Sequence, residues 1–429
     1  MRLPCVGLAD GVAEVALAHL VELVGGLEVQ RLPLDHCAAS NGCMKPSGMI
    51  QYGTMKRIVV NNNPFRYGCV VEDSFYCPRP LLEKQLAGFI RSGQNVVVQG
   101  ERRMGKTSLI NAVVRGMRGW RMIYVDLLHV MTVGDICRRI VSAVRNMEQK
   151  ASLFEKVLKL LPRLHPVMKI DASTGEIGFG LDVRAAEDPY SVEEVLDMLA
   201  KVAAAGRTVI VFDEFQDVCN LSDAQTVLAL MRGRIQFQGD IPYVFTGSVR
   251  SRMIELFDDP DSAFYKSALT LCVGEIDRSS FTAFLRGRFE SGHRHISDET
   301  VGAIMDKVAD VPGDVQQLCE AVWGVTSGNV KIEDIEAALQ IVFMREGEKF
   351  EGFCERLSPV QFKLLAAIAR LGGREIQSRA FLEEAGIGNA ASARKAAFRL
   401  CELRYIYLFR GEYRFTSMFF RAWLLRRDF

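Results

Sequence analysis

Short uncharged runs of aliphatic and β-branched residues alternate with longer amphipathic stretches between residues 55 and about 276. Runs of this kind are typical of buried strands, and the stretches between them have the apolar spacing of helices. The alternation predicts an α/β fold, with a parallel sheet that helices cover on both faces. The expected strands are residues 95–99, 121–126, 208–212, 242–246 and 269–273, and the expected helices include residues 191–205 and 223–232.

Two segments depart from this alternation. Residues 150–187 begin with an amphipathic stretch and continue through residues 169–179, which read as a hairpin, so we expect an insertion there. Residues 277–350 have no strand-like run and predict a small helical lid. Gly313 and Asp314 stand at an expected helix start, which favours equally a helix N-terminus near a bound ligand and a capped surface turn. The expected lid helices are residues 280–289, 298–308, 315–322 and 332–342.

Residues 351–429 predict a third unit. Ser358 and Gln361 have the spacing of a capping box, with Pro359 at the first helical position. Two further helices and a hairpin around Arg410-Gly411-Glu412 should follow. Helix, helix, helix and hairpin in this order predict a winged helix-turn-helix. The later elements are expected at residues 378–384, 389–403, 405–409 and 413–415.

Residues 1–54 differ from the rest of the chain. They carry a coil-like stretch at residues 40–48, and the first interpretable pattern begins at Met55. We therefore expect an atypical N-terminal extension, with Met55 as the native start. The alternative is a small amphipathic helix at residues 12–24 that docks on the body.

Composition narrows the class of protein. Of the 429 residues, 49% are hydrophobic and 24% are charged, which is ordinary for a globular protein of two or three domains. The 11 cysteines form no Cys-x-x-Cys pair and the 6 histidines have no zinc-site spacing, so we expect reduced thiols in the cytoplasm. No uncharged apolar run is long enough to span a membrane, and charges interrupt the apolar N-terminus, which disfavours a signal peptide.

A complete phosphate-binding loop follows the strand expected at residues 95–99. It reads Gly-Glu-Arg-Arg-Met-Gly-Lys-Thr, and an apolar-faced helix continues from it. Glycines let backbone N–H groups surround a phosphate in front of a helix N-terminus, and the lysine reaches the β- and γ-phosphates. The bland alternative is a glycine turn beside an exposed basic pair. The residues predicted to bind ATP are Gly100, Glu101, Arg102, Arg103, Met104, Gly105, Lys106, Thr107 and Ser108.

Two adjacent carboxylates end the uncharged run at residues 208–212. An apolar strand that delivers Asp213 and Glu214 to the edge of a sheet is what an Mg²⁺-dependent phosphoryl-transfer site requires. Thr107 and Asp213 are the predicted Mg²⁺ residues, and Glu214 would polarise the attacking water, with Lys106 as its catalytic partner. An acidic pair in this place is otherwise often a helix cap.

Hydroxyl groups at the end of the strand expected at residues 242–246 could complete the site. Thr246 and Ser248 would read the γ-phosphate or hold the attacking water, and a simple Ser/Thr turn explains them equally well. Gln216 could orient water or serve on the surface.

The C-terminal unit is basic and the remainder is acidic. From Ser358 onward there are 13 Lys and Arg against 6 Asp and Glu, which indicates a polyanionic or acidic partner. The third helix of a winged helix reads DNA in many proteins. Because alanines and Phe398 make this helix rather apolar, a protein-binding module is also open, and a charged, solvated face is the default interpretation. The candidate DNA contacts are Arg394, Lys395, Arg399 and Arg410.

Taken together, these motifs resemble the archaeal-type P-loop ATPase family, within the AAA+/STAND grouping. The resemblance runs from Met55 to Phe429. It implies that one strand separates the P-loop strand from the Walker B strand, and that Lys106, Thr107, Asp213 and Glu214 carry the nucleotide, the metal and the Walker B pair. The matching segments are residues 63–68, 100–109, 213–216, 246–248, 264–265, 313–319 and 421–424.

The lid departs from the family pattern. Asp314-Val315 replaces the usual residues, and the lid shows no clear sensor arginine. An arginine finger is unassigned among Arg250, Arg252 and Arg288, so we expect slow hydrolysis, with an oligomer left open.

The sequence therefore predicts an ATP-binding, Mg²⁺-dependent ATPase whose nucleotide state controls its winged helix. One alternative is a DNA-binding regulator or helper whose affinity is set by ATP. Another is a non-hydrolysing scaffold that binds ATP and recruits a protein partner, although the presence of Glu214 argues against it. The expected units are residues 1–54, 55–276, 277–350 and 351–429.

Overall fold

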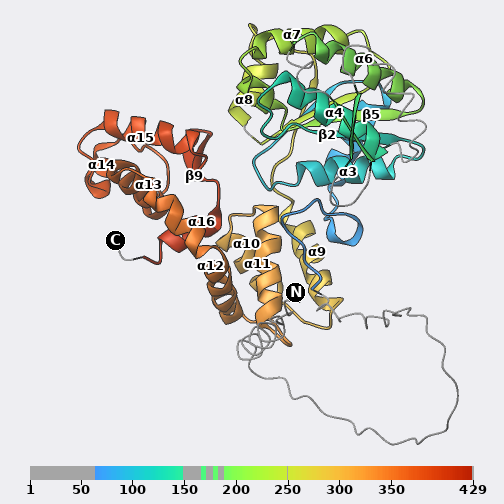
Figure 1. Cartoon of the computed structure of the whole chain (residues 1–429). Coiled ribbons are helices and arrows are strands. Elements are labelled where there is room, and N and C mark those ends of the chain that lie inside the picture. The colour runs from blue at the N-terminus through green and yellow to red at the C-terminus, as the bar shows by residue number, and fades with distance from the viewer. Residues whose placement is uncertain (1–62, 148–165, 171–176, 182–187, 249, 428–429) are drawn as a thin grey trace, which may run out of the picture. The chain divides into compact units, whose positions relative to one another are not determined.

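A parallel sheet of five strands forms the centre of the α/β core. The computed structural model describes residues 63–147, 166–170, 177–181, 188–248 and 250–427 (Figure 1). The strand order is β2-β5-β6-β1-β7, and all neighbours run parallel. The predicted P-loop fold is confirmed. The strands are β1 (Val96–Gln99), β2 (Arg121–Asp126), β5 (Thr208–Asp213), β6 (Tyr243–Gly247) and β7 (Leu269–Cys272).

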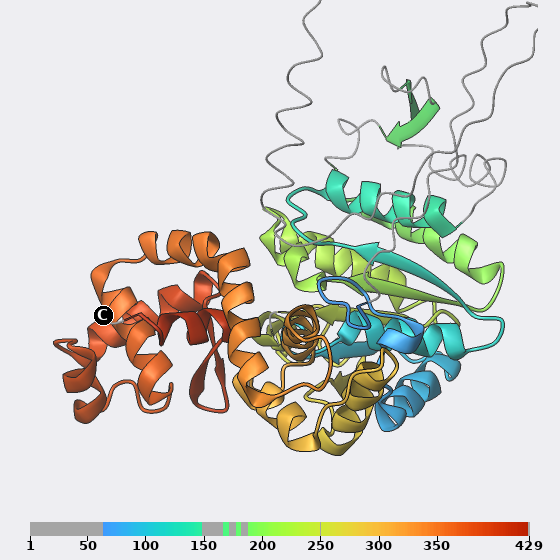
Figure 2. The ribbon, with the colours of Figure 1, turned by 90° about the horizontal axis from the view of Figure 1, so that it is seen from below.

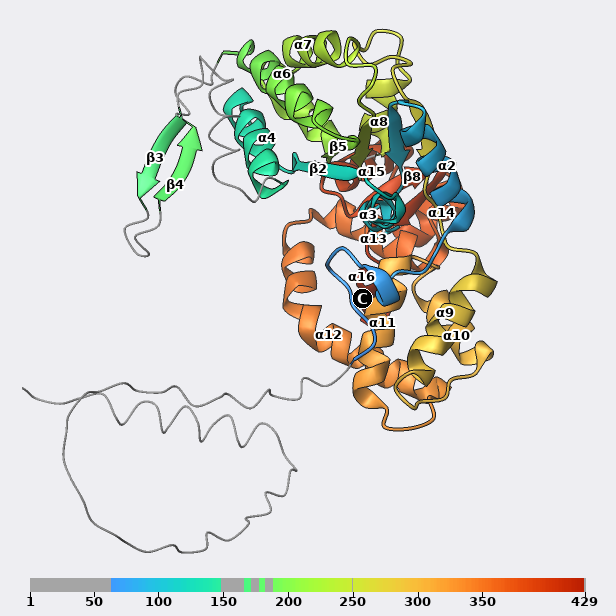
Figure 3. The same cartoon turned by 90° about the vertical axis from the view of Figure 1, so that its right-hand side faces the viewer.

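The two faces of the sheet pack into separate hydrophobic clusters. Successive strand residues point to opposite faces, so Val96 and Val211 join one cluster while Val97 and Ile210 join the other. Both faces are buried, which explains why the strands read as continuous apolar runs. Figure 3 shows α3 on one side of the strands and α4 and α6 on the other. The helices are α2 (Pro80–Arg91), α3 (Lys106–Gly116), α4 (Val133–Met147), α6 (Ser191–Ala204), α7 (Ala224–Ile235) and α8 (Arg250–Phe257).

The sheet order places three strand ends beside one another. β6 pairs with β1 on one side and with β5 on the other, as the resemblance implied. Gln99 lies opposite Gly247, and Phe212 lies opposite Phe245. The residues that follow these parallel strands therefore emerge at one edge of the sheet, where ligands bind in open α/β folds.

The lid is helical throughout, and its last helix is longer than predicted. α12 runs to Glu355 instead of ending near residue 342, because Phe343 and Phe350 continue its buried face. The ring of Phe350 packs 5.3 Å from that of Phe420. The expected boundary at residue 351 thus lies inside one continuous helix, and the lid and the C-terminal unit share a hydrophobic core. The lid helices are α9 (Arg278–Glu290), α10 (Asp298–Lys307), α11 (Pro312–Val325) and α12 (Ile332–Glu355).

The C-terminal elements follow in the predicted order, with helix caps that fix their starts. Both hydrogen bonds of the Ser358–Gln361 capping box are present. The side chain of Asn389 caps α15 by accepting from the N–H of Ser392. These elements are α13 (Pro359–Leu371), α14 (Arg379–Ala385), α15 (Ala390–Glu402), β8 (Ile406–Phe409), β9 (Glu412–Phe415) and α16 (Met418–Leu424).

The hairpin expected within residues 150–187 is also present. β3 (Pro166–Ile170) and β4 (Ile177–Leu181) pair antiparallel, with Ile170 opposite Ile177 (Figure 2). The helix considered at residues 12–24 and the proposed start at Met55 lie outside the described residues. Over the described ranges, no helix combines the length and hydrophobicity needed to cross a bilayer.

Candidate functional site

The phosphate-binding loop connects the end of β1 to the start of α3, and two glycines shape it for different reasons. A side chain at position 100 would collide with the carbonyl oxygen of Val273, so the loop can run this close to the end of β7 only because residue 100 is glycine. Gly105 precedes α3 with φ +83°, a left-handed conformation that favours glycine. The loop therefore leads into a helix N-terminus whose first N–H groups face the site.

Lys106 is buried within the loop. Its side chain is 8% exposed, and Nζ donates to the carbonyl oxygens of Gly100 at 2.8 Å and Glu101 at 3.0 Å. Burial lowers the pKa of its ammonium, and the charges of Glu214 and Asp213 oppose that shift. The lysine is thus held over the loop in a position that suits the binding of phosphate oxygens.

Thr107 and Asp213 meet, although 106 positions separate them in the sequence. The Thr107 hydroxyl donates to Asp213 Oδ2 at 3.0 Å, and the Tyr124 hydroxyl donates to the same oxygen. Burial raises the pKa of Asp213, and the two hydroxyl donors oppose this rise. A hydroxyl beside a carboxylate offers the hard oxygen donors that Mg²⁺ prefers, so these residues fit that ion.

Glu214 is held at the end of β5 by two polar side chains. Its Oε2 accepts from Gln216 Nε2 at 2.6 Å and from Ser248 Oγ at 2.8 Å. Burial alone would raise the pKa of Glu214, but these hydrogen bonds and the charge of Lys106 hold it below its usual range. Glu214 also has a left-handed backbone (φ +51°), which is uncommon for a residue with a side chain and occurs often at functional sites.

The two hydroxyl residues predicted at the end of β6 have different contacts, with Thr246 inside the strand and Ser248 just beyond it. Ser248 contacts Glu214, whereas Thr246 is fully buried and its hydroxyl has no hydrogen-bond partner in the described structure. The geometry brings Ser248, and not Thr246, to the acidic pair.

Arg103 joins the phosphate-binding loop to the lid. Its Nη1 lies 2.6 Å from Asp314 Oδ1, and its Nη2 donates to the Gly313 carbonyl at 2.9 Å and to Gln317 Oε1 at 2.6 Å. In return, the Gly313 N–H donates to the Arg103 carbonyl at 3.0 Å. The side chain of Arg103 is thus committed to the lid, and the N-terminus of α11 lies against the loop instead of forming a surface turn.

Asp314 is the buried partner in this link. It is 1% exposed, and burial raises its pKa to about 6, while the charge of Arg103 and the nearby Met418 backbone oppose the rise. Met418 begins α16, so this lid carboxylate lies beside both the phosphate-binding loop and the C-terminal unit.

Other loop residues have structural contacts. The Ser108 hydroxyl accepts from the Val71 N–H at 3.1 Å, and the Met104 carbonyl accepts from Arg79 at 2.7 Å. Arg79 is buried and also donates to the Gly274 carbonyl, so it fastens the loop to the end of β7.

These residues surround a cavity of about 840 Å³, which is large enough for a nucleotide. Its walls come from the loop, the segment before α2, the lid and the C-terminal unit. Two aromatic residues, Tyr67 and Tyr76, line this cavity. Phe65 instead packs against Phe289, with ring centroids 4.7 Å apart, and has a packing role. The predicted site residues that line the cavity are Arg102, Arg103, Gly105, Lys106, Thr107, Ser108, Asp213, Glu214 and Ser248.

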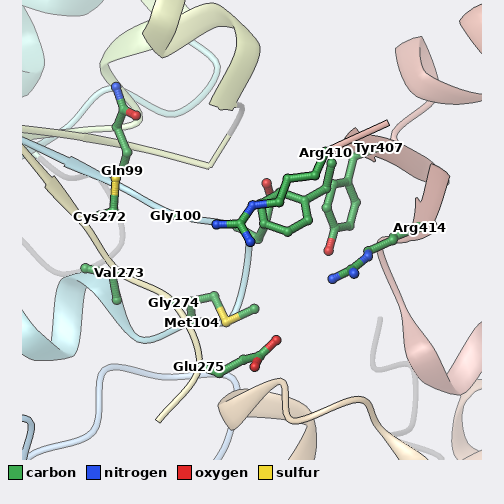
Figure 4. A pocket seen from close by; sticks show the side chains of 12 residues that line it. Gln99, Gly100, Met104, Cys272, Val273, Gly274, Glu275, Tyr407, Arg410 and Arg414 are labelled. Atoms are coloured by element: carbon green, nitrogen blue, oxygen red, sulfur yellow. The ribbon is translucent and has the colours of Figure 1, made fainter. Parts of the chain in front are cut away.

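A smaller cavity of about 220 Å³ lies between the phosphate-binding loop and the β8–β9 hairpin. Figure 4 shows Tyr407, Arg410 and Arg414 on the hairpin side, facing Gly100 and Glu275. Burial and the charges of Glu101 and Glu275 raise the pKa of Tyr407 to about 12. Arg410, predicted to contact DNA, therefore lines a cavity beside the loop.

The other candidate DNA contacts lie on α15. Arg394 donates to Gln377 Oε1 at 3.0 Å, and Arg399 pairs with Glu402 at 2.9 Å. Lys395 is exposed, and so is Phe398 on the same helix. The helix thus presents a mixed basic and aromatic surface.

Some residues of the site escaped the sequence analysis. Tyr124, Arg79 and Asp217 were not singled out, because their contacts depend on how distant elements pack. Only Asp217 had a local signal, since it lies three residues beyond Glu214 on the turn that Gln216 shares.

Comparison with known proteins is consistent with this architecture. Residues 90–252 match the AAA domain family and residues 348–426 match a probable winged helix domain. No curated protein matches the chain. Among solved structures, the Walker-type ATPase PABY2304 of Pyrococcus abyssi shares 16% identity and a TM-score of 0.58, covering 82% of this chain and 97% of the other. The Aeropyrum pernix ORC2 protein shares 13% identity and a TM-score of 0.52, covering 85% and 96%. An AAA-type domain is therefore followed by a C-terminal winged helix domain, the combination expected from the resemblance to the archaeal-type P-loop ATPases.

Proposed function

We propose that this protein binds ATP with Mg²⁺ and hydrolyses it to ADP and phosphate. The observation that carries the proposal is the contact between Thr107 and Asp213, which joins the phosphate-binding loop to the acidic strand end at 3.0 Å. The Aeropyrum pernix ORC2 neighbour was solved with ADPNP and ADP, which supports nucleotide binding by a similar fold.

Each residue has a role that its geometry supports. Lys106 and the loop N–H groups would bind the β- and γ-phosphates. Mg²⁺, held through Thr107 and Asp213, would neutralise charge on the phosphates. Glu214, whose low pKa keeps it ionised, would orient the attacking water and accept its proton. Ser248 would position Glu214 or the γ-phosphate.

We further propose that the nucleotide acts as a switch for the winged helix. Arg103 connects the loop to Asp314 of the lid, and the lid shares a hydrophobic core with the winged helix, where Phe350 packs on Phe420. A change at the loop would therefore bias the lid and the winged helix together, as in other switches driven by the γ-phosphate.

DNA binding controlled by ATP is the second candidate function. The exposed Lys395 and the basic C-terminal unit favour it, while Phe398, 66% exposed on the same helix, favours a protein partner. A gel shift with duplex DNA at rising salt distinguishes them, because contacts to phosphates weaken steeply with salt. A scaffold that binds ATP without turnover is the third candidate, and phosphate release decides it.

The test is equilibrium binding of fluorescent ATP and ADP, together with phosphate release, with and without Mg²⁺. Magnesium-dependent release of phosphate supports the ATPase. Binding without release supports the scaffold, and no binding contradicts the proposal.

A further inference from the structure

Arg404 lies between α15 and β8, where the hydrogen bonds that end α15 fix its backbone conformation. Its φ of +60° is left-handed, a conformation in which glycine is preferred at a helix C-terminus. The Arg404 N–H donates to the Cys401 carbonyl at 2.9 Å, and the next N–H, of Tyr405, donates to the Leu400 carbonyl at 3.0 Å. An arginine therefore occupies a place where its side chain carries a backbone cost.

The side chain of Arg404 enters the nucleotide cavity. It lines the same cavity as Lys106, Asp213 and Glu214, although it belongs to the winged helix. Its side chain is 36% exposed, and Nη2 lies 3.9 Å from Asp217 Oδ1. The winged helix thus contributes a positive charge to the wall of the phosphate site.

Asp217 ties this charge to the acidic strand end. Asp217 is fully buried and accepts from the His129 N–H at 2.9 Å and from Gln216 Nε2 at 3.1 Å. The same amide of Gln216 donates to Glu214 at 2.6 Å. Two hydrogen bonds and one ionic contact therefore connect Glu214 to Arg404.

The arginines considered earlier are engaged elsewhere. Arg252 donates to Asn220 Oδ1 at 2.7 Å, and Arg288 donates to the Pro64 carbonyl and lies over the ring of Phe75. The side chain of Arg250 lies outside the described side chains. Of the two whose side chains are described, neither lines the cavity.

We propose that Arg404 is an arginine finger that the winged helix supplies in cis, with Asp217 as the carboxylate that positions it. The proposal rests on the ATPase function proposed above. In hydrolysis, the water oxygen bonds to the γ-phosphorus while the bond to the β–γ bridging oxygen breaks, and ADP leaves with that electron pair. The water proton passes to Glu214 and then to the phosphate. Arg404 stays protonated and stabilises the negative charge on the transferring group.

This arrangement makes turnover depend on the position of the winged helix. A partner that displaces the winged helix withdraws Arg404 from the cavity and slows hydrolysis. The nucleotide, in turn, holds the winged helix through the contact between Arg404 and the terminal phosphate.

The test compares Arg404→Gly, Arg404→Lys and Arg379→Ala with wild type in the full chain. Glycine relieves the left-handed backbone, and buried Asp217 keeps its hydrogen bonds from His129 and Gln216 when the Arg404 charge is removed, so the melting temperature should stay close to that of wild type. Arg379 is the matched control, because its side chain is 92% exposed on α14 and pairs with Glu383. The readouts are single-turnover phosphate release and the affinities for fluorescent ADP and for a non-hydrolysable ATP analogue.

We expect Arg404→Gly to slow turnover at least ~1000-fold, the lower end of the range for a lost arginine finger. Its affinity for the ATP analogue should fall about tenfold, as expected for the loss of one charge-assisted hydrogen bond. Its affinity for ADP should stay within about twofold of the wild-type value. Arg404→Lys should recover part of the analogue affinity, and Arg379→Ala should match wild type. The proposal would be overturned if Arg404→Gly turned over ATP as fast as Arg379→Ala and had the same ratio of ATP-analogue affinity to ADP affinity. Absence of ATP binding by wild type would instead overturn the ATPase function on which it rests.

Discussion

Arg103 of the phosphate-binding loop and Asp314 of the lid form an ion pair at 2.6 Å, in which the carboxylate is 1% exposed. The pair is the direct mechanical link between the loop and α11. Because Gly313 also exchanges hydrogen bonds with Arg103, the lid cannot leave the loop without breaking several contacts together.

Arg103→Ala should destabilise the protein more than Asp314→Asn does. The first variant leaves the Asp314 charge buried without its partner, which costs about 3 kcal/mol at neutral pH, and the second leaves no buried charge. Denaturant unfolding at pH 7.5, followed by tryptophan fluorescence, measures both. Equal losses in the two variants would show that the pair has no electrostatic role.

The same carboxylate predicts a pH dependence of stability. The pKa of Asp314 is raised from 3.8 to about 6 in the folded chain, so the folded state binds its proton more tightly than the unfolded state does. Protonated Asp314 therefore stabilises the folded state below pH 4, and this stabilisation is lost as the pH rises through 6. The loss in the free energy of unfolding is on the order of 2–3 kcal/mol. Unfolding free energies of wild type and Asp314→Asn between pH 4 and 7 test this, because the variant lacks the titrating group. A constant difference between the two proteins over that range would contradict it.

Ser248→Ala should shift the pH profile of hydrolysis. The hydrogen bond from Ser248 helps to hold the pKa of Glu214 low, so its loss raises that pKa. The acid limb of turnover should move to higher pH by roughly one to two units, as for one lost hydrogen bond to a charged group, while turnover at pH 7, where Glu214 stays ionised, should change little. Thr246→Ser is the control, since Thr246 does not contact Glu214 in the described structure. An unchanged acid limb in Ser248→Ala would argue against Glu214 as the proton acceptor.

Tyr124→Phe should weaken the response to Mg²⁺. The Tyr124 hydroxyl donates to Asp213 and opposes the rise of its pKa, so the variant should favour the protonated, non-binding form. The Mg²⁺ concentration for half-maximal binding of fluorescent ATP should increase a few-fold, roughly as for a lost hydrogen bond. Identical Mg²⁺ titrations of the variant and wild type would remove Tyr124 from the metal site.

The sequence predicted those features that depend on local pattern. The uncharged runs that end at Gln99 and Asp213 marked the buried strands, and Ser358 marked the start of α13. The length of α12 was missed because its last turns are packed by distant residues of the winged helix: Phe350 contacts Phe420 and Trp423, and Arg426 lies over Phe343. Likewise, no local signal could pair Asp217 with Arg404, since that contact exists only after the winged helix has packed.

The most direct test of the account is ATP turnover by wild type, Glu214→Gln and Lys106→Ala, with nucleotide binding measured on the same samples. The account predicts that Glu214→Gln binds ATP about as well as wild type but loses hydrolysis, and that Lys106→Ala loses binding. Normal hydrolysis by Glu214→Gln would contradict the assignment of Glu214 and, with it, the proposed site.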